Sequence, residues 1–381
     1  MINFACRHYR GSKPCVYNKL DGSECPACAH TSEHRERILF IKLDSMGDVF
    51  RSQSLLPAII ARHQRPYIAW LTAKDSAEMV RMMRDVDEVI ELSAEGTARA
   101  MAGGWHQVYS LSNDLTSASL ATLVRGRCVP VGFYMRDGVI TPSNAAAMRW
   151  LEMGAFDRLK AANPLSYQRC MLDILGEPGD FAIPAPAVNV DEGLRRTAAA
   201  RLAKLFGDGA RPRVAVNIGS SARWPKKMLY AEQIYSYCRR LRERADVDML
   251  LLGGNAETEK AAAILAMRRP GDCIEAALTG NSVLEFMALL SQVDTLLCGD
   301  TLALHIAPAI GLPTVAVFGP TSFAEIHTFD GLIAKVRARG LDCFVCQGDC
   351  QKQHNCMTLM DLDELVELTL GQLQRAAARS A

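Results

Sequence analysis

The chain has 381 residues, of which 49% are hydrophobic and 22% are charged, a globular balance with room for two domains that each bury a core. Its 43 lysine and arginine residues nearly balance its 42 aspartate and glutamate residues, which argues against nucleic acid or an acidic membrane as the main partner. No apolar run reaches the ~18 residues of a membrane span, and the first residues lack a stretch of signal-peptide length. We therefore expect a cytoplasmic protein, with peripheral contact to the inner membrane left open.

Residues 1–34 are polar, rich in glycine, lysine and cysteine, and without clear periodicity. Four cysteines fall in this segment: Cys6, Cys15, Cys25 and Cys28. The last two form a C-x-x-C pair, the usual knuckle of a tetrahedral metal site. In a reducing compartment, clustered cysteines indicate a metal more than disulfides, and a metal would give a polar segment something to fold around. We predict a metal-binding leader; a flexible cysteine-rich leader is the alternative.

From residue 37 the pattern changes to short apolar runs that alternate with amphipathic stretches. Strands are predicted at residues 37–43, 67–71, 88–92, 107–111 and 128–133. Helices are predicted between them, at residues 74–83, 97–103 and 115–124, and after the first strand up to residue 61. This alternation predicts a parallel sheet with helices on both faces. We assign residues 35–180 to a first Rossmann-like domain.

Residues 177–188 hold three prolines and a glycine, which is typical of a linker. A second alternating block follows, with strands predicted at residues 214–217, 249–252, 295–298 and 314–318 and helices at 228–242, 256–267, 283–290 and 302–310. We assign residues 190–360 to a second Rossmann-like domain and residues 361–381 to a C-terminal helix. The expected fold class is α/β, with two doubly wound domains facing a central cleft, so ligands should bind beyond the carboxyl ends of the strands.

The loop after the first predicted strand reads L-D-S-M-G-D-V and contains Asp48. Gly47 permits a tight turn or close approach of a substrate, and Asp48 falls at the start of a predicted helix. An Asp at this place is commonly an N-cap. The functional alternative is a general base that takes a proton from an acceptor hydroxyl. Taken alone, the motif favours the cap.

Three loops of the second block carry candidate donor-binding residues. Small residues and then basic ones follow residue 217, which suits phosphate binding by backbone N–H groups and cations; a solvated basic turn is the alternative. In the GGNAE loop, a glutamate either accepts hydrogen bonds from a nucleoside or caps the next helix. The run GDTLALH places a threonine and a histidine on one helix face, where structural roles are the alternative. The candidates are Ser220, Ser221, Arg223, Lys226, Glu257, Asp300, Thr301 and His305.

A second cysteine cluster lies near the C-terminus. It consists of Cys343, Cys346, Cys350 and Cys356. Four thiolates this close in sequence form a compact site if all of them ligate one ion. Because thiolates suit zinc and iron about equally, we predict a structural metal at both clusters without naming the ion.

The order and spacing of these motifs resemble glycosyltransferase family 9, the heptosyltransferases of lipopolysaccharide core assembly, over about residues 37–365. The resemblance implies the GT-B fold, inverting transfer of heptose from ADP-heptose and no metal at the reaction centre. It implies that Asp48 is the base, that Asp300 and Thr301 contact the donor, that Glu257 lies near the nucleoside, and that His305 is structural or positions the donor. Similar cysteine tails recur in the family, and some members of its protein-modifying branch hold iron there.

Two departures from the family pattern fall on the donor side. Leu302 stands where the family usually has glycine, and Ala222 stands where it usually has lysine. The expected function is therefore a glycosyltransferase that moves a heptose-like sugar from a nucleotide-sugar to a hydroxyl of a surface glycan or glycolipid, with no cofactor for the chemistry. Two alternatives remain: a protein heptosyltransferase of the autotransporter-modifying type, and an inactive metal-binding scaffold. A nucleic acid partner is not expected.

Overall fold

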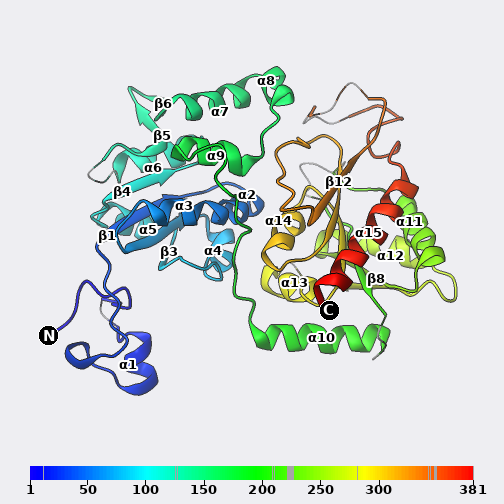
Figure 1. Cartoon of the computed structure of the whole chain (residues 1–381), viewed down its shortest axis with the longest axis horizontal. Helices are drawn as coiled ribbons and strands as arrows, with labels where there is room; N and C mark the ends of the chain where they lie inside the picture. The colour runs from blue at the N-terminus through cyan, green and yellow to red at the C-terminus, as the bar shows by residue number, and fades with distance from the viewer. Residues whose placement is uncertain are drawn as a thin grey trace. The chain divides into compact units, whose positions relative to one another are not determined.

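The computed structural model describes the chain except for residues 12, 125, 127, 208, 210, 221–226, 281, 342, 344, 347–349 and 381. The chain divides into two compact units, whose elements are labelled in Figure 1. Unit 1 comprises Met1–Leu151 and Arg169–Ala182, and unit 2 comprises Glu152–Gln168 and Ile183–Ala381. Residues 152–168 thus group with unit 2, although they precede the proline-rich segment.

Unit 1 is built on a six-stranded sheet in the order β3-β2-β1-β4-β5-β6. Its strands are β1 (Glu36–Ile41), β2 (Pro66–Thr72), β3 (Glu88–Glu91), β4 (Gln107–Ser110), β5 (Val131–Arg136) and β6 (Val139–Pro142). All neighbours pair in parallel except β5 and β6. This is the strand order of a Rossmann fold, and it confirms the predicted α/β class for this half of the chain.

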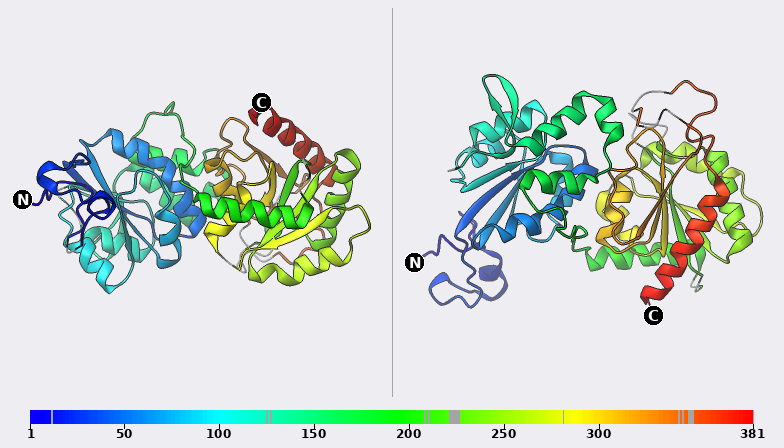
Figure 2. Two further views of the ribbon diagram at one scale, coloured as in Figure 1. Left: turned by 90° about the horizontal axis from the view of Figure 1, so that it is seen from below. Right: turned by 45° about the horizontal axis from the view of Figure 1, so that its top comes forward.

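Helices flank this sheet because its central strands are apolar on both faces. In β1 the four residues from Ile38 to Ile41 are fully buried, as expected of a parallel strand covered on both sides. The helices of unit 1 are α2 (Met46–Arg51), α3 (Leu56–Ala61), α4 (Lys74–Val80), α5 (Ala94–Met101) and α6 (Leu115–Leu123). Two further helices, α7 (Ala145–Ala155) and α9 (Tyr167–Leu175), have most of their residues in unit 1 and the rest in unit 2. Figure 2 shows the two units from two further directions.

The antiparallel hairpin of β5 and β6 corrects one sequence prediction. A strand was expected at residues 128–133, but β5 begins at Val131 and continues to Arg136. Asp137 and Gly138 then form the turn, with φ values of 51° and 80°. An Asp-Gly pair with positive φ at both residues suits the tight turn of a two-residue hairpin. This dipeptide, and not the apolar pattern, was the sequence signal for the hairpin.

Unit 2 is built on a second six-stranded sheet, in the order β12-β11-β10-β7-β8-β9, which is again the Rossmann order. Its strands are β7 (Arg213–Asn217), β8 (Asp248–Gly253), β9 (Ile274–Leu278), β10 (Thr295–Gly299), β11 (Thr314–Phe318) and β12 (Ile333–Arg337). The two outermost, β9 and β12, were not predicted, because an edge strand is only partly buried and its apolar run is interrupted.

The helices of unit 2 are α8 (Asp157–Ala162), α10 (Glu192–Phe206), α11 (Ala231–Arg244), α12 (Thr258–Ala266), α13 (Val283–Leu290), α14 (Leu302–Ala309) and α15 (Leu362–Ser380). The sequence predicted the last five of these and missed α8 and α10. The missed α10 has only Ala198 and Leu202 buried, so its sequence shows little apolar periodicity. The core of the unit gathers β7, β8 and β10 with α11, α12 and α15.

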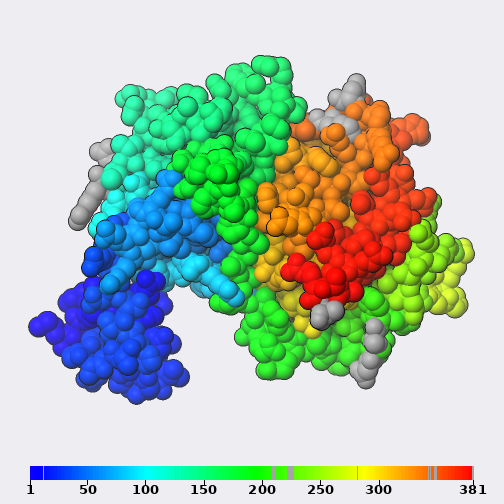
Figure 3. Space-filling view, in the orientation of Figure 1, coloured from blue at the N-terminus to red at the C-terminus, as the bar shows by residue number. Residues whose placement is uncertain are grey.

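The leader has a defined path but no core of its own. It contains α1 (Val16–Asp21) and a 3-10 turn at Cys25–Ala27, and none of its described residues is buried. Arg7 ties it to the rest of unit 1 through an ion pair with Asp87 at 2.9 Å. The leader protrudes as a separate lobe in the space-filling view of Figure 3.

Candidate active site

Asp48 lies in the first turn of α2 but does not cap it. The N-cap is Ser45, whose hydroxyl donates to Asp48 Oδ2 at 2.7 Å. The other carboxylate oxygen pairs with the guanidinium of Arg51 at 2.6 Å, and the Asp48 side chain is 32% exposed. The N-cap interpretation is therefore wrong in detail. The geometry leaves a partly exposed, oriented carboxylate, which the positive end of a helix favours in its ionised form.

A second carboxylate in the same loop, Asp44, has a structural environment. It pairs at 2.8 Å with the ammonium of Lys42, which is only 3% exposed and which also donates to the carbonyl of Leu111 at 2.8 Å. The Ser112 hydroxyl bonds the same oxygen of Asp44. These contacts join the loop after β1 to the loop after β4, so the backbone that carries Asp48 is held from the neighbouring strand.

In unit 2 the ends of β7 and β10 are joined by a polar contact. Asn217, the last residue of β7, donates from Nδ2 to the hydroxyl of Thr301 at 3.0 Å. Thr301 is the N-cap residue of α14, and its side chain makes no cap hydrogen bond. Its hydroxyl donates to the carbonyl of Gly299 at 3.5 Å. Two of the loops singled out from the sequence therefore meet beyond the carboxyl ends of these two strands, which we call the carboxyl edge of the sheet.

Asp300 contacts the side chains of a lysine and a histidine at the same edge. The ammonium of Lys227 lies 3.4 Å from Asp300 Oδ2 and 3.3 Å from the Asp300 carbonyl oxygen. His305 Nε2 lies 3.8 Å from Asp300 Oδ1, which makes an ion pair only when the imidazole is protonated. Asp300 does not cap α14, because Thr301 stands at that position. Both partners restrict the carboxylate, so its direction is fixed before any ligand arrives.

Glu257 reaches the same edge from the glycine-rich loop. It is the last residue of a 3-10 turn, Asn255–Glu257, and its Oε2 accepts the N–H of Gly254 at 2.8 Å. A Cβ placed on Gly219 would lie 2.8 Å from Glu257 Cδ. The lack of a side chain at Gly219 therefore lets the carboxylate lie over the loop after β7. Glu257 also stands at the N-cap position of α12, without a side-chain cap bond.

The remaining donor-side candidates divide into two groups. Ser220 is described and half-buried, whereas Ser221, Arg223 and Lys226 lie outside the described residues, as does Ala222. Sequence reasoning did not commit to Asn217, Lys227 or Arg51 as site residues, although each adjoins a motif that it singled out. A polar residue that closes a buried strand, as Asn217 does, was the available signal.

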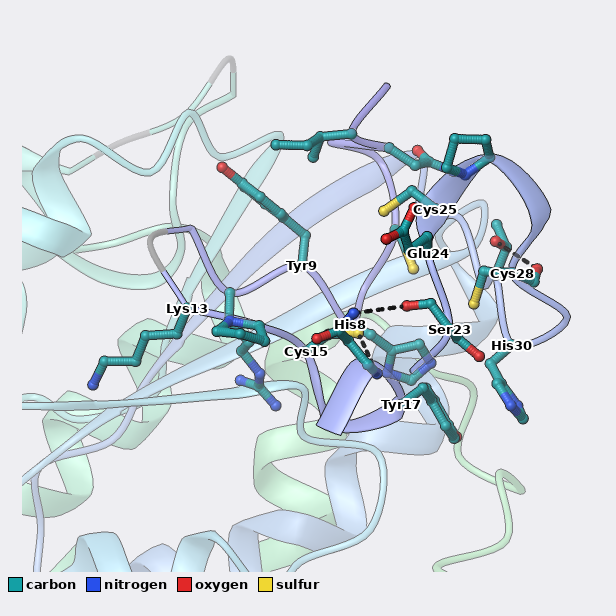
Figure 4. Close-up of a pocket in the computed structure, with 18 of the residues that line it drawn as sticks. His8, Tyr9, Lys13, Cys15, Tyr17, Ser23, Glu24, Cys25, Cys28 and His30 are labelled. Carbon is teal, nitrogen blue, oxygen red and sulfur yellow. Dashed lines mark hydrogen bonds between the residues drawn. The ribbon is translucent and has the colours of Figure 1, made fainter. Parts of the chain in front are cut away.

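The four leader cysteines line a single cavity of about 450 Å³. Figure 4 shows Cys15, Cys25 and Cys28 among the residues around it, together with His8 and His30. Cys15 Sγ accepts the N–H of Asn18 at 3.4 Å. Within the described part of the chain, no three His, Cys, Asp or Glu side chains are arranged to hold a metal ion. The fold thus gathers the predicted ligands around one space without placing them in coordinating positions.

The C-terminal cysteines are also neighbours. Burial raises the pKa of the half-buried Cys356 thiol, and the nearby Cys346 and Cys350 raise it further. None of the thirteen cysteines, all of which lie among the described residues, forms a disulfide. No helix in the described ranges is long and apolar enough to cross a membrane.

Comparison with known proteins agrees with this architecture. Residues 171–355 match the family model "Glycosyltransferase family 9 (heptosyltransferase)". Escherichia coli ADP-heptose lipopolysaccharide heptosyltransferase II is 17% identical, with 89% of this chain and 99% of that one covered and a TM-score of 0.65. A family 9 glycosyltransferase from Veillonella parvula is 14% identical, with 91% and 99% covered and a TM-score of 0.71.

A third solved structure is the iron-containing dodecameric glycosyltransferase TibC of enterotoxigenic E. coli. It is 11% identical, with 95% of this chain and 81% of that one covered and a TM-score of 0.50. A search of curated proteins finds no match. At these identities the structural likenesses show the fold alone, and they confirm the GT-B class predicted from the sequence.

Proposed function

We propose that this chain, of which residues 171–355 match the model of glycosyltransferase family 9, transfers a heptose-like sugar from ADP-heptose to a hydroxyl of a surface glycan such as lipopolysaccharide core, with inversion. The observation that carries the proposal is the pair of oriented carboxylate sites, Asp48 after β1 and Asp300 after β10, each following a parallel strand where such sheets bind ligands. The similar E. coli protein is described as acting with ADP-heptose on lipopolysaccharide, which supports the same donor and acceptor for this chain.

In this proposal Asp48 is the catalytic base. Its carboxylate takes the proton of the acceptor hydroxyl while that oxygen bonds to the anomeric carbon of the sugar. The bond between the anomeric carbon and the diphosphate oxygen breaks on the opposite side, and ADP leaves with the bonding electrons. Arg51 and Ser45 keep the carboxylate turned in one direction before the reaction, so less orientation has to be achieved in the transition state.

The donor would be held by unit 2, in residues 190–360, and the acceptor by unit 1, in residues 35–180. Thr301 and the N–H groups that open α14 suit the diphosphate, Asp300 the sugar, and Glu257 the nucleoside. Lys227 offers a cation for the charge that develops on the leaving group. The basic residues Arg223 and Lys226, with Ser220 and Ser221, complete the proposed donor set, and His305 positions Asp300.

A structural metal at each cysteine cluster belongs to the same proposal, with no metal or cofactor in the chemistry. The leader cysteines surround one cavity in a segment that lacks a core, so a bound zinc or iron ion would stabilise the leader by drawing the thiolates inward. The tail cysteines have the soft donor set that suits zinc or iron. Elemental analysis of purified protein should find zinc or iron; a metal-free, fully folded protein would contradict this part.

A polypeptide acceptor is the second candidate. The resemblance implies that some protein-modifying members of the family hold iron at a cysteine tail, and in this chain the tail cysteines lie close together. TibC, which shares the fold, is described as iron-containing. We place the protein in the cytoplasm, with peripheral contact to the inner membrane where a lipid-linked acceptor would be met.

The test is a calorimetric titration of the full chain with ADP-, GDP- and UDP-sugars, followed by transfer assays with core lipopolysaccharide and with polypeptide. Preference for a GDP- or UDP-sugar would overturn the heptose assignment. Transfer to polypeptide alone would select the second candidate. If the chain binds none of these sugar nucleotides, the inactive metal-binding scaffold is the interpretation that remains.

A further inference from the structure

Lys260 hydrogen-bonds two backbone carbonyls that lie eleven residues apart in sequence. It lies on α12, and its ammonium donates to the carbonyl of Ile218 at 2.9 Å and to the carbonyl of Leu229 at 2.7 Å. Ile218 and Leu229 are themselves fully or almost fully buried. These two carbonyls belong to the residues on either side of positions 219–228: Ile218 directly follows β7, and Leu229 lies two residues before α11. One side chain therefore fixes the separation of the two ends.

Residues beside both anchored ends belong to the proposed donor site. Next to Ile218, Gly219 lies so close to the carboxylate of Glu257 that an added Cβ would come within 2.8 Å of Glu257 Cδ. Two residues before Leu229, Lys227 pairs with Asp300. The backbone of Lys227 also passes close to β10, because a Cβ on Gly299 would lie 2.0 Å from the Lys227 carbonyl oxygen. A shift of either end would therefore move Glu257 or the Lys227–Asp300 pair.

Burying the Lys260 ammonium costs desolvation free energy. Burial lowers the pKa of Lys260 to about 8, although the carboxylates of Glu257 and Glu232 act in the opposite direction. An apolar side chain of similar length would avoid that desolvation. A partly buried cation that bonds two carbonyls beside a ligand site is consistent with a role in that site, because perturbed groups concentrate where ligands bind.

We propose that Lys260 is a positioning residue of the donor site: by bonding the Ile218 and Leu229 carbonyls it holds Glu257 and the Lys227–Asp300 pair in place for a nucleoside diphosphate. The inference rests on the proposed function, since it assumes that the donor binds at this edge of unit 2. Lys260 itself does not touch the donor. Its effect reaches the ligand through the two ends of the segment.

The test is calorimetric titration of the full chain with ADP at pH 7 and pH 9. Lys260→Met should weaken ADP binding by about tenfold at pH 7, which corresponds to ~1.4 kcal/mol. Wild-type affinity should fall between pH 7 and pH 9 as the ammonium loses its proton, because charge-assisted hydrogen bonds are the stronger ones. The Met variant should lack that part of the pH dependence. Lys204→Met, at an exposed position of α10, is the matched control and should bind ADP like the wild type.

A merely structural lysine predicts a different pattern. In that case Lys260→Met would lower the midpoint of thermal unfolding while ADP affinity and its pH dependence stayed those of the wild type, and this outcome would overturn the inference. Should the Met variant fail to fold, Lys260→Gln, which keeps one donor group, decides instead: intermediate ADP affinity supports the role, and wild-type affinity with the wild-type pH dependence refutes it. A wild-type chain that binds no ADP would refute the proposed function itself, which distinguishes the two failures.

Discussion

Two carboxylates four residues apart in one loop should respond in opposite ways to the same substitution. Asp44 pairs with Lys42, whose side chain is 3% exposed. Asp44→Asn therefore removes a charge that pairs with an almost fully buried ammonium, whereas Asp48→Asn places an amide of the same shape beside Ser45 and Arg51, whose side chain is 10% exposed. We expect Asp44→Asn to reduce the free energy of unfolding and Asp48→Asn to reduce turnover.

The size of each effect follows from the contacts. Breaking a buried ion pair costs about 3–5 kcal/mol. Because Asp44 is 29% exposed and the amide oxygen still accepts a hydrogen bond, about 2–3 kcal/mol is expected. For a domain of this size that corresponds to a fall of roughly 4–12 °C in the unfolding midpoint. Loss of a general base should lower kcat by about 10²–10⁴-fold, over and above any stability lost with the Asp48–Arg51 ion pair.

Calorimetric unfolding and a transfer assay on the two purified variants measure both quantities. The assignment of roles fails if Asp44→Asn unfolds like the wild type. It fails equally if Asp48→Asn keeps wild-type turnover, since the amide has no basic oxygen to accept the proton.

Three further outcomes are expected. Gly219→Ala should weaken ADP binding while leaving the unfolding midpoint nearly unchanged, because the added Cβ meets the flexible end of Glu257 at 2.8 Å; unchanged affinity in calorimetry would contradict the placement of that carboxylate. Asn217→Leu removes the hydrogen bond to Thr301 and should cost about 1 kcal/mol of ADP affinity, roughly fivefold, which an equilibrium titration resolves. The stability of the wild type relative to Lys260→Met should rise between pH ~8 and pH 10.5, because there the unfolded chain binds a proton that the native chain has released; urea unfolding midpoints that fall through this window would refute the shifted pKa.

The apolar alternation was sufficient to predict both sheets because their central strands are buried on both faces and so form uninterrupted runs. In β7, β8, β10 and β11 nearly every residue is buried. The edge strands β9 and β12 are only partly buried and were missed. The hairpin of β5 and β6 depends on the backbone conformation of Asp137 and Gly138, which apolar periodicity does not register.

The candidate site was predictable where polar residues follow the ends of buried strands. Asp48, Glu257 and Asp300 each follow such a strand, so the rule on strand ends found them. Lys42 and Lys260 were not found, because a lysine inside a strand or helix pattern gives no sign of being buried. Their roles depend on carbonyls of Leu111, Ile218 and Leu229 that lie 31 to 69 residues away in sequence, and only the fold brings those together.

The most direct test of the central claim is consumption of ADP-heptose by the full chain in the presence of heptose-deficient core lipopolysaccharide, with the product's anomeric configuration read by NMR. The account predicts release of ADP, an inverted glycosidic linkage, and a rate reduced by at least about 10²-fold in Asp48→Asn. Retention of configuration, use of a GDP- or UDP-sugar in place of ADP-heptose, or undiminished transfer by Asp48→Asn would contradict it.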